Sequence, residues 1–157
     1  MTEEKINGEL LLTLPDGFRT LSGEERRKLT YIGGDDWPGF SDPERHVLLT
    51  AGWKRIPLFS AWLLSAKDLA KNTEKQLRAA MQPFGYRLLG FAEQAAAGGR
   101  MPAFRYAYEK EGVGMRAEAC VLKRGRTVYW LYYYEREALE DPALRDSILG
   151  SARFAEE

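Results

Sequence analysis

The chain has 157 residues, of which 45% are hydrophobic and 29% are charged, as in an ordinary soluble protein. This length suffices for one domain with its own core, so we expect residues 1–157 to form a single domain. Lysine plus arginine equals aspartate plus glutamate at 23 each, so the formal net charge is zero. Proteins that bind polyphosphates usually carry a basic excess, so the balance argues against nucleic acid or an anionic membrane surface as the main partner.

The sequence carries no sign of export or of membrane insertion. Residues 1–8, MTEEKING, lack the basic segment and apolar stretch of a secretory signal. The longest apolar run, LFSAWLL at 58–64, is far shorter than the roughly 20 residues that a membrane-crossing helix needs. Cys120 is the single cysteine, so no disulfide can form within the chain. We therefore expect a cytoplasmic protein with no membrane span.

The N-terminal part predicts a strand, a short helix and an irregular loop. INGELLLTLPDGF predicts a strand at residues 9–14 that ends at a Pro-Asp-Gly turn. Ser22 and Glu25 have the spacing of a helix capping box, so a short, exposed helix is expected there. Glycine, proline and acidic residues then make 33–44, GGDDWPGFSDPE, a loop.

One long amphipathic helix is predicted near the middle of the chain. Before it, RHVLLTAGWKR (45–55) predicts a strand and PLFSAWLL (57–64) an extended continuation or edge segment. Ser65 and Asp68 again have capping-box spacing, with Asp in the place of Glu. The helix is expected over 66–82. Its predicted buried face consists of Leu69, Thr73, Leu77, Ala80, Met81 and Phe84.

The second half predicts an antiparallel meander of four strands followed by a helix. The strand-like runs are YRLLGFAEQA (86–95), PAFRYAYEK (102–110), MRAEACVLKR (115–124) and TVYWLYYYER (127–136). Short glycine-bearing connections between such runs are typical of hairpins. Basic residues in LKRGR (122–126) are expected to keep one hairpin tip solvated. Asp141 followed by Pro142 predicts the start of a final helix at 142–150.

The run VYWLYYY at 128–134 is apolar on both sides of a strand. One side would carry Val128, Trp130, Tyr132 and Tyr134, and the other Tyr129, Leu131 and Tyr133. Such a strand is typical of the middle of a sheet covered on both faces. The predicted fold is α+β, a three-layer α/β/α sandwich around a central antiparallel sheet. Core packing is favoured over a base-stacking platform, because no basic excess and no RNA-binding signature is present.

No motif points to catalysis, to a metal or to a cofactor, and none is expected. His46 has no evident orienting partner, and Cys120 has the pattern of a small buried residue. The acids of the 33–44 loop lack the spacing of an EF-hand. The candidate binding residues are Asp35, Asp36, Trp37 and Phe40 in this loop, with Tyr106 and Tyr132 on the sheet. Long loops with aromatic side chains are often recognition elements; the alternative is that Trp37 and Phe40 pack back onto the sheet.

Four stretches of the sequence carry a family resemblance. They are LLLTLPDGF, LSGEERRK, SAKDLAKNTEKQLRAAM, and VYWLYYYERE followed by a helix. Their order resembles that of the PsbP-like superfamily, which includes Ran-binding Mog proteins, the photosystem P subunit and bacterial DcrB-like proteins. The resemblance spans nearly the whole chain and implies a small partner-binding or assembly protein, since most members are not enzymes. Many bacterial relatives carry a lipidated N-terminal cysteine, whereas Cys120 is mid-chain; no family site residue is carried over.

These observations predict a non-enzymatic adaptor or assembly protein whose partner is another protein. A chaperone for a secretion effector is a specific version, because some DcrB-like relatives hold apolar helices on the sheet. That version requires exposed side chains among Trp62, Leu64, Tyr106 and Tyr132. The alternative is a small-molecule-binding domain or weak enzyme, with a cleft lined by Tyr106, Tyr108, Tyr132 and Glu118. It requires a pocket in which ionisable groups converge.

Overall fold

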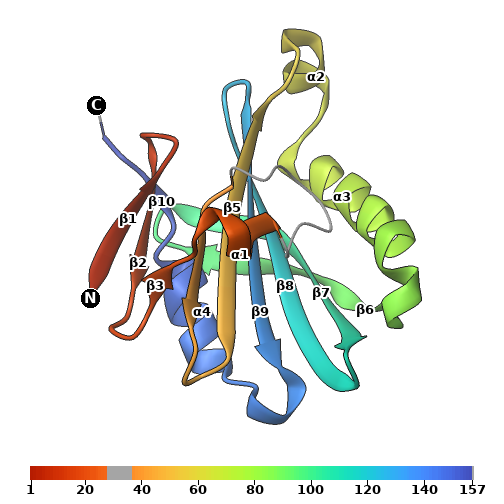
Figure 1. The fold of residues 1–157 in the computed structure, drawn as a ribbon. Coiled ribbons are helices and arrows are strands. Elements are labelled where there is room, and N and C mark those ends of the chain that lie inside the picture. Colours follow the sequence, from red (N-terminus) through yellow and green to blue (C-terminus); the bar gives the residue numbers. More distant parts are fainter. Residues whose placement is uncertain (28–36, 157) are drawn as a thin grey trace.

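A computed structural model of the chain describes residues 1–27 and 37–156, and in it a large antiparallel sheet dominates (Figure 1). The strand order in this sheet is β3-β4-β5-β9-β8-β7-β6. The strands are β3 (Arg19–Thr20), β4 (Gly39–Asp42), β5 (Val47–Arg55), β6 (Arg87–Ala96), β7 (Gly99–Lys110), β8 (Val113–Arg124) and β9 (Thr127–Arg136). The predicted meander β6 to β9 is confirmed, and β9 lies between β5 and β8 in the middle of the sheet.

A small second sheet joins the two ends of the described chain. It has the order β1-β2-β10, with β1 (Thr2–Ile6), β2 (Leu10–Leu14) and β10 (Arg153–Phe154). β2 confirms the first predicted strand, whereas β1 and β10 were not predicted. The sequence of β1, TEEKI, shows no apolar alternation because only Ile6 is buried. β10 has only two residues, too few for a pattern.

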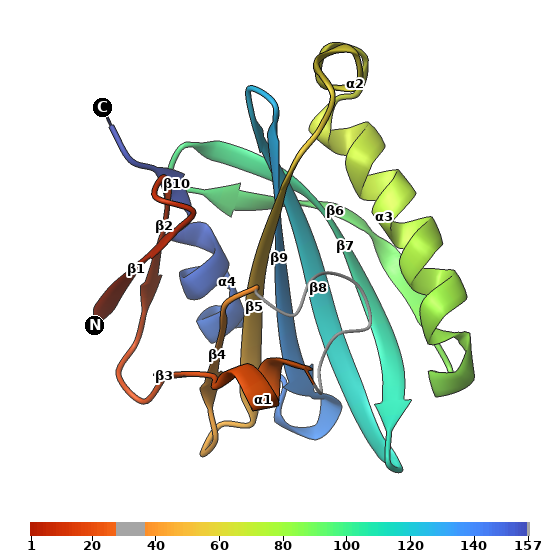
Figure 2. The same cartoon turned by 45° about the horizontal axis from the view of Figure 1, so that its top comes forward.

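Helices cover both faces of the large sheet, which confirms the predicted α+β sandwich (Figures 1 and 2). The helices are α1 (Gly23–Arg27), α2 (Leu58–Leu63), α3 (Ala66–Met81) and α4 (Pro142–Gly150), with 3-10 turns η1 (Gln82–Phe84) and η2 (Glu137–Leu139). α3 packs on β7 and β8. On the opposite face, α4 and the small sheet together form the third layer.

The predicted helix starts are confirmed by their hydrogen bonds. Ser65 and Asp68 form a reciprocal capping box at α3, and Ser22 and Glu25 form the same pair of bonds at α1. At α4 the Asp141 carboxylate accepts a hydrogen bond from the Leu144 amide at 3.1 Å. These side chains satisfy amides that have no partner inside a helix, which fixes where each helix begins.

Three local expectations were wrong. Residues 58–63 form α2 rather than an extended segment. Pro57 lacks the N–H that would continue the β5 ladder, and its carbonyl accepts the first helical bond from the Ala61 amide. β4 lies inside the segment that was expected to be only a loop. On α3, Ala80 is exposed and Glu74 is buried instead, because Arg78 and Tyr86 pair with the Glu74 carboxylate.

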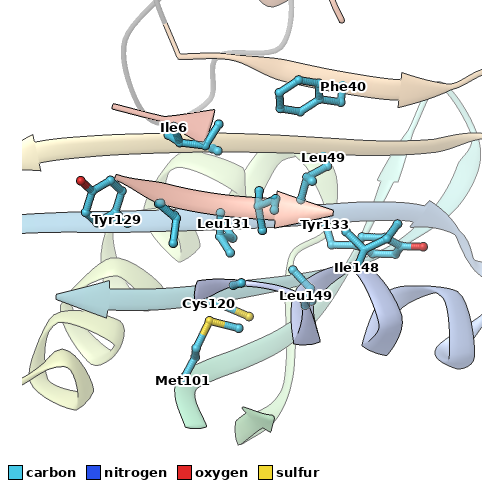
Figure 3. Packing of buried hydrophobic residues seen from close by; sticks show 14 of the residues in the cluster. Ile6, Phe40, Leu49, Met101, Cys120, Tyr129, Leu131, Tyr133, Ile148 and Leu149 are labelled. Atoms are coloured by element: carbon cyan, nitrogen blue, oxygen red, sulfur yellow. The ribbon is translucent and has the colours of Figure 1, made fainter. Parts of the chain in front are cut away.

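The two faces of β9 belong to two different hydrophobic clusters. Tyr129, Leu131 and Tyr133 pack against β2 and against Ile148 and Leu149 of α4 (Figure 3). On the other face, Tyr132 packs with Leu77 and Met81 of α3 and with Tyr106 of β7. Each such side chain contributes about 1.5–3 kcal/mol when it leaves water. The aromatic run is therefore a central strand of the core, as its two apolar sides predicted.

Tyr129 connects the large sheet to the small one. Its hydroxyl donates to the Glu9 carboxylate and accepts from Asn7 Nδ2 at 3.1 Å. Its ring meets the Phe154 ring edge-on, with 5.6 Å between the ring centroids. Burial, together with the hydrogen bond to Glu9, raises the pKa of Tyr129 to about 12, so the hydroxyl is protonated at neutral pH. One side chain thus contacts residues from both ends of the described chain.

Candidate functional site

The candidate residues named from the sequence are mostly buried. Trp37 stacks on Trp130, with 5.9 Å between ring centroids, and lies over Tyr132 at 6.4 Å. Tyr106 and Tyr132 belong to the cluster under α3, whereas Phe40 is buried in the cluster on the other side of the sheet. Asp35 and Asp36 lie outside the described residues. The structure thus brings Trp37, Tyr106 and Tyr132 together, and only Trp37 of these is partly exposed.

Gly52 makes the stacking of Trp37 possible. A Cβ atom at this position would lie 2.0 Å from Cδ2 of the Trp37 ring, much closer than any real contact. We expect Gly52→Ala to displace the ring and to reduce the free energy of unfolding by about 1–3 kcal/mol. The tryptophan emission maximum should also shift to longer wavelength. Gly98→Ala is the matched control, because nothing lies within 4 Å of a Cβ there; equal emission spectra for both variants would contradict the stacking.

The tyrosines under α3 are core residues and lack the features of a catalytic cleft. Burial raises the pKa of both Tyr132 and Tyr106, so both hydroxyls remain protonated at neutral pH. The Tyr132 hydroxyl is buried and has no hydrogen-bond partner among the described residues. Neither tyrosine lines any of four cavities of about 250–420 Å³ in the described part of the chain. Proton transfer to a ligand at these two residues is therefore not supported by their surroundings.

The helix α2 carries four of the large apolar side chains that are exposed in the described chain. Its side chains Leu58, Phe59, Trp62 and Leu63, here named the α2 patch, are 68%, 69%, 80% and 55% exposed. Only Ala61 of this helix is buried. Figure 1 shows α2 at one end of the molecule, beyond the body of the sheet. Monomeric proteins rarely leave a contiguous group of large apolar side chains in water, so the α2 patch is a candidate interaction site.

The tip of the β8–β9 hairpin holds α2 in place. Lys123 Nζ donates to the carbonyl oxygens of Ala61 and, at 2.8 Å, of Leu64, which caps the C-terminal end of the helix. Arg126 Nε donates to the Ile56 carbonyl at 3.1 Å, just before the helix starts. The basic residues expected only to solvate this turn therefore also fix α2 from both ends. The α2 patch is thus displayed on a fixed element.

Polar side chains from three neighbouring strands meet on the face of the sheet that α4 covers. Arg105, Glu118 and Tyr133 lie opposite one another on β7, β8 and β9. Two residues further along β8 and β9, Arg116 lies opposite Glu135. Glu118 is only 1% exposed, and Arg105 Nε donates to its Oε1 at 2.5 Å. A buried carboxylate needs such a partner, because burying an unpaired charge is strongly unfavourable.

Arg145 of α4 lies over these polar residues, which together with it are here named the polar array. Its side chain is 9% exposed, and its Nε donates to Asp146 at 3.3 Å. Burial raises the pKa of Glu135, while the backbone amide of Asp141, at 2.7 Å, and the charge of Arg145 act in the opposite direction. Burial also raises the pKa of the Cys120 thiol, next to Glu118, and this cysteine is a buried small residue, as predicted.

A cavity of about 420 Å³ opens beside the polar array. Its lining residues are Leu89, Gly90, Phe91 and Ala92 of β6 with Arg105, Arg116, Glu140 and Arg145. The arrangement can bind a polar or charged group, but it presents no activated nucleophile. Of the polar array, only Glu118 was named from the sequence as a candidate site residue, whereas Tyr133 was predicted to be a core residue. The sequence did contain one signal for the array: charged residues occur at alternate positions of strands whose other residues are apolar, such as Arg116 and Glu118 in β8, and therefore share one face of the sheet.

Comparisons with known proteins identify the fold. No protein-family model matches the chain, and no curated protein matches it in sequence. Within the described residues, no helix is both long and apolar enough to cross a bilayer. The chain is similar in structure to LpqN, a protein involved in cell envelope biogenesis of Mycobacterium tuberculosis. The TM-score is 0.58 at 14% identity, over 94% of this chain and 83% of LpqN.

A protein from Bacteroides thetaiotaomicron gives a TM-score of 0.56 at 8% identity, over 94% of this chain. Here the chain spans 46% of the length of the protein that it matches. At such low identities the similarity concerns the fold alone. The chain therefore shares its general fold with LpqN and with one part of the Bacteroides protein.

Proposed function

We propose that the chain is a non-enzymatic, cytoplasmic partner-binding protein of the PsbP-like superfamily, and that it binds another protein through the α2 patch. The observation that carries this proposal is the exposure of four large apolar side chains on a helix with one buried residue. Each of these side chains gains about 1.5–3 kcal/mol when a partner covers it completely. Tryptophan is among the residues most often found at binding hot spots, which makes Trp62 the expected anchor.

The way in which α2 is held favours binding over local fraying. The bonds from Lys123 and Arg126 fix the helix before a partner arrives, so less conformational entropy is lost on association. The complementary surface on the partner is an apolar groove or an apolar helix. The adaptor or assembly role follows from the family resemblance.

A chaperone for a secretion effector is the more specific form of this proposal. Of the side chains that it requires at the surface, Trp62 is exposed and Leu64 is half-buried, while Tyr106 and Tyr132 are covered. An apolar helix of an effector would accordingly bind at α2 and not on the sheet under α3. A binding role for Asp35, Asp36, Trp37 and Phe40 stays a prediction of its own, separate from the α2 patch.

The test is affinity capture from native lysate with the double variant Phe59→Ser and Trp62→Ser. We expect it to lose a partner that the wild type retains, with affinity reduced at least 30-fold, or about 2 kcal/mol. The free energy of unfolding of the double variant, measured by thermal unfolding, should stay within about 0.5 kcal/mol of the wild-type value, because both side chains are exposed.

The matched control is Val113→Ser with Leu139→Ser, two exposed apolar residues on other elements. This control should retain the partner. Retention of the same partner by the α2 variant would contradict the proposal. Loss of the partner in a Trp37→Ala variant, with retention by the α2 variant, would place the site at the loop instead.

A further inference from the structure

The strand β6 forms a long open margin of the large sheet. It is the last strand in the sheet order, and β7 is its only partner among the described strands. The opposite margin, β3, has two residues, whereas β6 has ten. Along a marginal strand, the N–H and C=O groups that point outward lack a ladder partner and can pair with another extended chain.

The second half of β6 lacks the features that usually protect such a margin. Proteins blunt their edge strands with lysine, proline or a bulge. The bulge of β6 lies between Leu88 and Gly90, and pairing with β7 is regular over residues 91–96. The sequence of this part, FAEQAA, contains no lysine and no proline, and its one charged residue is Glu93. It therefore presents a regular open edge.

A cavity of about 420 Å³ lies beside this edge, between β6 and α3. It is on the α3 side of the sheet, because the Phe91 ring that lines it packs against Phe104, with 6.0 Å between the ring centroids. α3 packs mainly on β7 and β8, and half of Phe91 stays exposed. On the opposite side of the sheet, a cavity of about 380 Å³ borders Ala95 and Ala96. Side chains on both faces of an added strand thus have room.

The wall that α3 contributes to the first cavity is positively charged. Lys67 and Lys71 line it, both are exposed, and neither forms an ion pair with a described residue. Glu93 also lines the cavity, but its carboxylate lies 3.6 Å from Arg100. Asp68, next to Lys67 in the sequence, accepts hydrogen bonds in the cap of α3. Both nearby carboxylates are therefore already engaged, and the two lysines carry the unpaired charge.

The spacing of the two lysines matches that of side chains on a strand. Four residues of an α-helix rise about 6 Å along its axis, and alternate residues of a strand are about 6.4–6.8 Å apart. Two carboxylates at alternate positions of an added strand can therefore face Lys67 and Lys71 at the same time. Opposite charges across the contact also favour an acidic segment over a basic one.

We propose that residues 91–96 of β6 bind an extended segment of a partner protein as an added strand of the large sheet. Acidic side chains at two alternate positions of this segment face Lys67 and Lys71. In strand addition the main-chain hydrogen bonds supply affinity, and the alternating side chains supply specificity. The proposed edge shares no residue with the α2 patch, so either proposal can fail without the other.

The test is a binding titration of the whole chain with the peptide acetyl-Thr-Val-Glu-Val-Glu-Val-Thr-amide at low ionic strength. This acidic peptide should bind at least tenfold more tightly than the same peptide with glutamine in place of both glutamates. N-methylation of its five central amides removes the donors but keeps the charge, and should abolish binding. No binding of the acidic peptide, or equal affinities for the acidic peptide and either of the other two, would overturn the proposal.

A charge-reversal variant identifies the groups on the protein. Lys67→Glu with Lys71→Glu should reduce the affinity for the acidic peptide at least tenfold and should bind a peptide with lysine in place of both glutamates. The matched control is Lys54→Glu with Arg55→Glu, two exposed basic residues at the end of β5, which changes the net charge equally. The control should bind the acidic peptide within twofold of the wild type. An equal loss in both variants would show an effect of net charge alone and would refute the site.

Hydrogen exchange locates the bound peptide. Amides within residues 91–96 should gain protection when the acidic peptide binds, and the variant Phe59→Ser with Trp62→Ser should bind it like the wild type. Protection at α2 without protection at β6 would contradict the placement. If the chain alone sediments as a dimer that the peptide dissociates, a second copy occupies the edge and the assignment to a partner segment is wrong.

Discussion

Replacing Tyr129 with alanine is expected to reduce the free energy of unfolding by about 3–5 kcal/mol, as for other large aromatic residues removed from a core. The side chain is fully buried. Its loss leaves a cavity between the two sheets and removes the contacts to Glu9, Asn7 and Phe154 at once. Chemical denaturation with urea measures the change. A loss below about 1 kcal/mol would mean that the small sheet does not depend on this residue.

Tyr129→Phe is the matched control, because it keeps the ring and removes only the hydroxyl. We expect it to cost about 1 kcal/mol or somewhat more, since the hydroxyl bonds to a carboxylate. The difference between the two variants then separates ring packing from hydrogen bonding. If both variants are equally unstable, the hydroxyl and not the ring holds the small sheet.

The same residue predicts a dependence of stability on alkaline pH. The pKa of Tyr129 is raised to about 12 in the folded protein, against about 10 in an unfolded chain. The contribution of the protonated hydroxyl is therefore complete below pH 10 and is lost as the pH rises toward 12, by up to about 1.4 kcal/mol per pH unit. Tyr129→Phe lacks this contribution, so its disadvantage relative to wild type should shrink over this range. A constant difference between the two proteins from pH 9 to 12 would contradict the raised pKa.

Arg105→Ala is the second change with a large expected effect. It leaves the buried Glu118 carboxylate without its partner, which typically costs about 3–5 kcal/mol. We expect the lower end of this range, because Arg105 is 41% exposed and its removal admits water to the site. Denaturant titration at neutral pH measures the loss.

Removing both charges tests the cause of this loss. The double variant Arg105→Met and Glu118→Leu fills the same space with apolar side chains and should recover to within about 1 kcal/mol of the wild type. Failure of this recovery would show that Arg105 stabilises the fold by something other than its pairing with Glu118.

The elements that could be predicted from the sequence are those that a local pattern determines. The two apolar sides of β9 indicated a central strand, and capping residues such as Ser65 and Asp141 fixed the helix starts. α2 was missed because its apolar side chains point to solvent, so the sequence shows no polar face from which a helix could be inferred. The edge strand β1 was missed for the opposite reason, since only one of its residues is buried.

The candidate sites depend on contacts between distant parts of the chain. Arg105, Glu118 and Arg145 have ordinary local surroundings and come together only through strand register and the position of α4. Lys123 looked like a solvating residue at a turn, because its carbonyl acceptors lie about sixty positions earlier in the sequence. Neither set of contacts can be recognised from a short stretch of the sequence. Trp37 could be named from its loop, but its stacking depends on Gly52 of a separate strand.

The position of β2 between β1 and β10 has a consequence for the order in which the chain folds. β1 and β2 are synthesised before the other strands of the described chain, yet Leu11 pairs with Arg153 only after more than 140 further residues have been made. The hairpins of β6 to β9 close over short distances and can form before that. On the ribosome, one edge of β2 therefore stays unpaired until β10 has been synthesised. Shielding of that edge by a nascent-chain chaperone would be most useful in this interval.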